Sequence, residues 1–252
     1  MILFDTLDTE ETAREFRRDR LEKIDKGEVW SPMSEGPYCV LHWLPVSKVA
    51  LFSPDDLNLK PADFCKFVGD KRIGGIEAIS SPDSVRIYSD QKDEIQEGSD
   101  SDGEKLNIRL FWNVQIFRSG ALEMTHALSF FKNEPDKKEV PLKCVLDKLR
   151  KTMDEFKKCM SHFKITLPVI VEVSFLHVLN CKFFDNSNGP FSSPFYLDEE
   201  QIVLMGMPTR NLVEVQNIEE IELPVFNRLW RRFGYQEGCR DHYDRYGMRT
   251  IS

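Results

Sequence analysis

Apolar residues recur along this chain with a helical period in three segments. The strongest repeat spans residues 141–163, where Pro141 is suited to the first position of a helix. A shorter repeat predicts a helix at 9–26, and a third predicts one at 222–233. The apolar positions are Ala13, Phe16, Leu21 and Ile24 in the first helix, Leu142, Val145, Leu146, Leu149, Met153, Phe156, Met160 and Phe163 in the long helix, and Val225, Phe226, Leu229, Trp230 and Phe233 in the last.

The N-terminal helix carries its own start and stop signals. Asp8 is expected to cap it, with Glu11 reaching back to the cap, and Gly27 to end it. Outside a narrow apolar stripe the helix is charged, with several arginines interleaved with acidic residues. We interpret it as a solvated helix lying on the domain. The alternative is a helix that docks on a partner or faces nucleic acid.

Strands are predicted by other patterns. The segments Tyr38–Val46 and Val169–Leu179 are apolar almost throughout, which is typical of central strands that are buried on both faces. Residues 106–117 and 121–128 predict a hairpin that turns at Ser119-Gly120. Together these elements predict one α+β domain over residues 1–252, with a mostly antiparallel or mixed sheet and three main helices packed on it. An exposed acidic loop is expected at 90–105.

Composition narrows the class of protein. The chain is 41% hydrophobic and 30% charged, with a net charge of −8 and a pI near 5.3, as in an ordinary globular protein. An acidic surface repels phosphate backbones, so nucleic-acid binding over the whole surface is disfavoured. A local patch of basic residues could still bind nucleic acid. The six cysteines are widely spaced and form no zinc pattern. We therefore expect reduced thiols, a cytoplasmic location, no membrane association, no metal and no cofactor.

Candidate catalytic residues are few. Phosphate-loop, dinucleotide-binding, metalloprotease and serine-hydrolase motifs are all missing from the sequence. Glu123 and Glu172 are the acidic residues of interest, because a carboxylate in an apolar strand is costly unless it is paired. An enzyme acting on nucleic acid would use them as metal ligands, close together in an open cleft. The simpler interpretation is structural, with Glu123 paired to Arg118 across the turn.

Basic residues supply the candidates for nucleic-acid binding. Lys151 and Lys158 belong to a lysine-rich face of the long helix, and Arg231, Arg232 and Tyr243 to an aromatic and basic C-terminal region. Such interleaving can stack on bases and clamp single strands. The structural interpretation of the lysine-rich face is that it is simply solvated. The structural interpretation of the C-terminal region is that its aromatic residues cap the end of the hydrophobic core.

Four stretches, taken in order, resemble one family. They are Phe16–Arg20 with Gly27, Gly36–Pro45, Phe117–Glu123 and Leu229–Tyr235, which read FRRDR, GPYCVLHWLP, FRSGALE and LWRRFGY. The set resembles the C-terminal region of bacterial proteins whose N-terminal half is an AlbA_2 domain (Schlafen-like, "divergent AAA"), a DNA-binding domain. The resemblance runs over nearly the whole chain, which lacks the AlbA_2 domain itself.

The resemblance implies a role but no catalytic residue. It implies a non-enzymatic interaction or sensing module of a bacterial DNA-related system, in regulation or phage defence, that acts with a protein partner. The alternatives are a metal-dependent enzyme that processes nucleic acid, with Glu123 and Glu172 as ligands, and a domain that binds nucleic acid directly.

Overall fold

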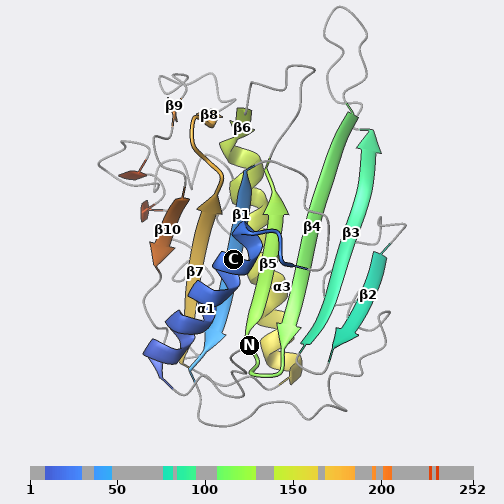
Figure 1. Cartoon of the computed structure of the whole chain (residues 1–252), viewed down its shortest axis with the longest axis vertical. Coiled ribbons are helices and arrows are strands. Elements are labelled where there is room, and N and C mark those ends of the chain that lie inside the picture. Colours follow the sequence, from blue (N-terminus) through green and yellow to red (C-terminus); the bar gives the residue numbers. More distant parts are fainter. Residues whose placement is uncertain are drawn as a thin grey trace, which may run out of the picture.

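The computed structural model contains a seven-stranded antiparallel sheet in the order β10-β7-β1-β5-β4-β3-β2 (Figure 1). The structure describes residues 9–29, 37–46, 76–81, 84–94, 107–128, 139–163, 168–184, 195–196, 201–205, 227–228 and 231–232. The strands of the large sheet are β1 (Tyr38–Pro45), β2 (Ile76–Ser81), β3 (Ser84–Glu94), β4 (Asn107–Phe117), β5 (Leu122–Ala127), β7 (Val169–Leu176) and β10 (Gln201–Met205).

Two helices cover opposite faces of this sheet. Helix α1 (Glu10–Asp25) lies in front of β1, β5 and β7 in Figure 1, and α3 (Leu142–Phe163) lies behind β1 and β5. The α+β class is thereby confirmed, with two helices rather than three in the described part of the chain. Of the third predicted helix, 222–233, only 227–228 and 231–232 are described, and these four residues are helical.

The two long apolar runs form neighbouring strands inside the sheet. Every residue of β1 and β7 is buried, and the two strands pair antiparallel over eight residues, from Tyr38 opposite Leu176 to Pro45 opposite Val169. The prediction of central strands is therefore confirmed. The second run ends earlier than expected, because His177 and Asn180 adopt positive φ values of 55° and 60°. The chain turns there into β8 (Lys182–Phe184) of a small sheet with β6 (Glu139–Pro141) and β9 (Phe195–Tyr196).

The predicted hairpin is also confirmed. β4 and β5 are joined at Arg118–Gly120, where Phe117 N–H donates to the Ala121 carbonyl at 2.9 Å. Gly120 has a φ of 82°, a conformation that favours glycine, so this turn needs the residue it has. Residues 90–94, which were predicted to belong to the acidic loop, instead form the end of β3, which pairs with β4 as far as Glu94 opposite Asn107. Residues 95–106 lie outside the described part.

Helix α1 begins one residue later than predicted. Its N-cap is Thr9, whose hydroxyl accepts from Thr12 N–H at 3.1 Å while Thr12 bonds back to Thr9 N–H. The expectation that Asp8 and Glu11 form this capping box is therefore wrong. The threonine one position later caps the helix instead, and its hydroxyl accepts from Thr12 N–H rather than from Glu11 N–H. At the other end Gly27, with a φ of 67°, ends the helix as predicted.

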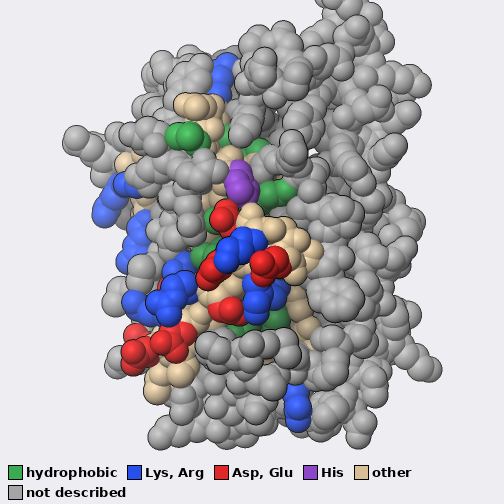
Figure 2. Space-filling view, in the orientation of Figure 1, with side chains coloured by type: hydrophobic (Ala, Val, Ile, Leu, Met, Phe, Trp, Pro, Cys, Tyr) green, Lys and Arg blue, Asp and Glu red, His purple; other side chains and the backbone are tan. Residues whose placement is uncertain are grey.

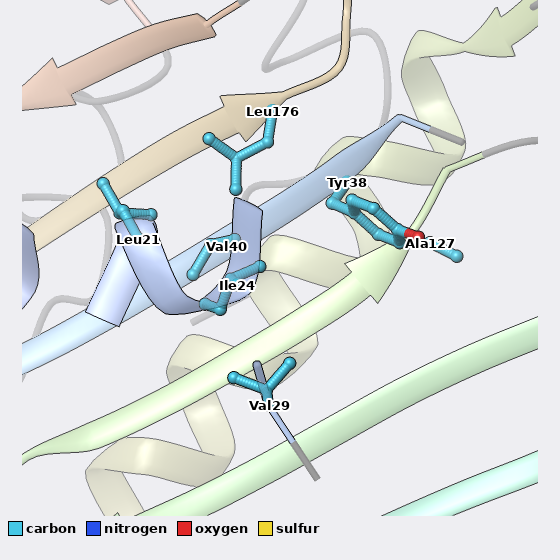
Figure 3. Packing of buried hydrophobic residues seen from close by; sticks show 7 residues of the cluster. All are labelled: Leu21, Ile24, Val29, Tyr38, Val40, Ala127 and Leu176. Carbon is cyan, nitrogen blue, oxygen red and sulfur yellow. The ribbon is translucent and has the colours of Figure 1, made fainter. Parts of the chain in front are cut away.

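The apolar stripe of α1 packs on the sheet as the period predicts. Leu21 and Ile24 join Tyr38 and Val40 of β1 in one cluster, and Figure 3 shows them between the end of the helix and the strands. Phe16 and Ala13 enter a second cluster with Leu44, Phe117, Ala121 and Ile170. Arg17 and Arg20 lie along the helix between the residues of the two clusters, and both contact the sheet.

Candidate functional site

A row of buried polar side chains crosses the sheet beneath α1. His42 on β1 lies opposite Glu123 on β5 and, on its other side, opposite Glu172 on β7. Glu123 in turn lies opposite Gln115 on β4. His42, Glu123 and Glu172 are fully buried, and Gln115 is almost so. We call Gln115, Glu123, His42 and Glu172 the polar row.

Strand alternation places the row on the face that α1 covers. Tyr38, Val40 and Leu44 of β1 share a face with His42 and pack against α1. The residues between them face α3 instead, as the edge-on contact of Trp43 with Phe156 shows, with ring centroids 6.2 Å apart. The polar row therefore lies within the layer between helix and sheet.

Arg20 of α1 is the main partner of Glu123. Its Nε and Nη2 donate to the two carboxylate oxygens at 2.8 and 2.9 Å, a two-pronged geometry that is among the strongest available to an ion pair. Nη2 also lies 3.3 Å from Gln115 Oε1, and the guanidinium carbon lies 4.9 Å from the centre of the Phe117 ring. Only 11% of the Arg20 side chain is exposed.

The charge of Glu123 is stabilised although it is buried. Burial alone would raise the pKa of this carboxyl, but the charge and hydrogen bonds of Arg20 outweigh burial and hold the pKa well below its ordinary value. His42 contributes in the same direction, with Nε2 3.1 Å from Glu123 Oε2. In the same way Glu123 raises the pKa of Arg20, against the opposing effect of burial. The pair is therefore ionised on both sides at neutral pH.

Arg17 makes the second ion pair, with Glu172. Its Nε is in ionic contact with the carboxylate, and its Nη1 lies 3.4 Å from Ser174 Oγ on the same strand. The contact with Glu172 is not aligned as a hydrogen bond, so neither carboxylate oxygen accepts one from any described residue. His42 Nδ1, Thr125 Oγ1 and Asn113 Oδ1 are buried without a hydrogen-bond partner in the same described region.

The structure brings both candidate carboxylates to one row but not into an open cleft. Glu123 and Glu172 flank His42 on either side, so their backbones lie about 10 Å apart, two strand spacings. Each is covered by α1 and paired with an arginine of that helix. The predicted partner of Glu123, Arg118, is wrong, because the carboxylate bonds to Arg20 and His42 instead. Among the described residues no three acidic, histidine or cysteine side chains are arranged to hold a metal ion.

The other candidates lie elsewhere. Lys158 is exposed on α3, while only the backbone of Lys151 on that helix is described. Arg231 and Arg232 are exposed on the helical residues near the C-terminus, and Arg228 is exposed beside them. Tyr243 lies outside the described residues.

Arg17 and Arg20 were missed as parts of this site, although the sequence contains a signal for them. At 3.6 residues per turn, both lie between Phe16 and Leu21 on the helix circumference, in the middle of the apolar stripe. An arginine at that position must be buried with the stripe, and it then requires a buried carboxylate. The interpretation of these two arginines as solvated is therefore wrong. The outward face is charged as predicted, and Figure 2 shows acidic and basic side chains interleaved over α1.

Comparisons with protein-family models, curated proteins and solved structures found no match to this chain. Within the described residues no helix is long and apolar enough to cross a membrane.

Proposed function

We propose that this domain is a non-enzymatic interaction or sensing module that works with a protein partner. The observation that carries the proposal is that both carboxylates of the polar row are paired with arginines of α1. Arg17 and Arg20 take up the charges of Glu172 and Glu123, and all four side chains serve to hold α1 on the sheet. A set of buried charges that fixes one helix in one position suits a domain that reports on that helix.

The same contacts weigh against metal-dependent processing of nucleic acid. A divalent cation needs free carboxylate oxygens, and Arg20 donates to both oxygens of Glu123. The guanidinium also places a positive charge where the cation would have to bind, and like charges repel strongly in a buried site. This enzyme would first have to lift α1 from the sheet.

The biological setting of the proposal comes from the resemblance to the C-terminal regions of AlbA_2 proteins. We place the module in a bacterial, cytoplasmic, DNA-related system, in regulation or phage defence. The partner is then an AlbA_2-type protein, a nuclease or an ATPase. The resembling stretch Phe16–Arg20 contains both arginines that bind the polar row, which links the resemblance to the geometry.

Capture of partners from the native host tests the proposal. The tagged chain should recover one such protein specifically, and the two purified proteins should bind again when mixed. The opposite result is a folded chain that binds no protein and cleaves DNA or RNA in Mg²⁺ or Mn²⁺. Loss of that cleavage in a Glu123→Gln variant that keeps the amide-exchange protection of α1, β1 and β7 would establish the enzyme instead.

Direct nucleic-acid binding is a second candidate, favoured by one specific observation. Arg228, Arg231 and Arg232 are spaced three and four residues apart at helical positions, and all three are exposed. This places three positive charges on one side of a helix in a chain of net charge −8. Binding of a labelled oligonucleotide should then weaken steeply with salt and be lost when the three arginines are replaced by alanine. Equal binding by Lys158→Ala would separate this surface from α3.

A further inference from the structure

On the face of the sheet beneath α1, several buried polar atoms form no hydrogen bond with α1 or with any other described residue. Glu172 is fully buried, yet neither of its carboxylate oxygens accepts a hydrogen bond within the described structure. His42 Nδ1 and Thr125 Oγ1 are likewise buried and unmatched there. Leaving buried acceptors without donors is unfavourable, and most proteins avoid it. The polar row is therefore matched only in part by the helix that now covers it.

Helix α1 contacts this face as a peptide ligand contacts a groove. It inserts apolar side chains into two clusters, with Phe16 in one and Leu21 and Ile24 in the other. Between them it presents two arginines three residues apart, which are neighbours on a helix surface. Its outward face carries salt bridges within the helix, such as Lys26 with Glu22. An amphipathic helix bound through anchors at such spacings is a recurring mode of peptide recognition.

We propose that this face is a receptor for an arginine-bearing amphipathic helix of a partner protein, and that α1 occupies it as an intramolecular ligand. The partner helix presents two arginines three residues apart between apolar anchors, so that one reaches Glu123 and the other Glu172. It displaces α1 when its arginines bind Glu123 and Glu172 at a concentration high enough to compete with Arg20 and Arg17. This rests on the proposed function and names the class of partner for it.

Charge complementarity identifies the occupant. The receptor face contributes two carboxylates, Glu123 and Glu172, together with Gln115 and Ser174, which contact the arginines of α1. Guanidinium groups match carboxylates in planar, two-pronged geometry better than ammonium groups do. A lysine-bearing helix would satisfy the charges but not this geometry. A tethered helix competes at an effective concentration on the order of mM, so α1 holds the face until a better ligand arrives.

The test uses the full chain and a labelled peptide with the sequence of residues 9–26. Arg17→Ala/Arg20→Ala weakens the intramolecular helix, so this variant should bind the peptide at least tenfold more tightly than the unaltered chain does. Arg18→Ala is the matched control, because Arg18 is 76% exposed, and it should bind like the unaltered chain. In the peptide, replacing the arginines equivalent to Arg17 and Arg20 should weaken binding at least tenfold, and lysines there should not restore it.

Amide hydrogen exchange in the unaltered chain gives a second measurement, which is valid even if the Arg17→Ala/Arg20→Ala variant does not fold. Excess peptide should accelerate exchange within α1 at least tenfold and leave β1 and β7 unchanged. The proposal is overturned if the peptide changes nothing in α1, or if it binds while α1 stays protected. Failure here would leave the proposed function intact if the chain still captured its partner, since that partner would then use another surface.

Discussion

Replacing Arg20 by alanine should strongly weaken the docking of α1. The substitution removes both donors to Glu123 and leaves its charge in a fully buried position, 3.1 Å from His42. Removing one partner of a buried ion pair costs about 3–5 kcal/mol, because the remaining charge has lost its compensation. Loss of the contact with Phe117 adds about 0.5–1 kcal/mol. The equilibrium for docking should therefore shift by roughly a hundredfold or more.

Urea unfolding and amide exchange measure the two consequences separately. The midpoint in urea, followed by tryptophan fluorescence, to which buried Trp43 contributes, should fall by at least about 1 M if α1 and the sheet unfold together. If α1 opens alone, its amides should exchange roughly a hundredfold faster while those of β1 and β7 hardly change. Arg18→Ala, at a site 76% exposed, should change stability by less than about 0.5 kcal/mol.

A double-mutant cycle then isolates the pair. Arg20→Ala and Glu123→Gln should each be costly, while the double variant should recover part of the loss, with a coupling on the order of 1–3 kcal/mol. A loss below about 1 kcal/mol for Arg20→Ala, with α1 still protected from exchange, would refute the idea that this pair holds the helix.

Three further outcomes follow from the same geometry. Because the folded pKa of Glu123 lies below its ordinary value near 4.5, its stabilisation is fully present above that value and is lost as the pH falls further; the stability gap between the unaltered chain and Glu123→Gln should therefore narrow in acid denaturant titrations. Glu172→Gln should cost less free energy of unfolding than Glu123→Gln, because Glu172 accepts no hydrogen bond from the described residues; equal costs would contradict this ranking. Gly27→Ala should cost about 1–2 kcal/mol in thermal unfolding from its φ of 67° alone, since an added Cβ meets no atom within 4 Å.

Local patterns in the sequence were enough to predict α1, α3, β1, β7 and the β4–β5 hairpin, because each depends on neighbouring residues. The apolar stripe of α1, the buried run of β1 and the glycine turn of the hairpin are all decided within a few positions. The boundaries were less accurate. Thr9 and Asp8 are both good capping residues, and only the backbone geometry shows which one accepts the hydrogen bond.

The polar row could not be assembled from the sequence, because it depends on register between distant strands. His42 is separated by 81 residues from Glu123, and the pairing of β1 with both β5 and β7 brings them together. A shift of one residue in either pairing would send a carboxylate to the opposite face. Sequence reasoning identified both glutamates as costly to bury but had no means of finding their partners.

The two ion pairs fix α1 at a single position along the sheet, which apolar packing alone would not do. A stripe of apolar side chains can slide by one turn, about 5.4 Å, and still bury much of its area. Arg17 and Arg20 cannot move by that distance without leaving Glu172 and Glu123 buried and uncompensated. The docked state is therefore defined sharply and is lost as a whole when the pairs break. A helix that is held in one defined position is consistent with the module proposed above, whose partner would act by releasing it.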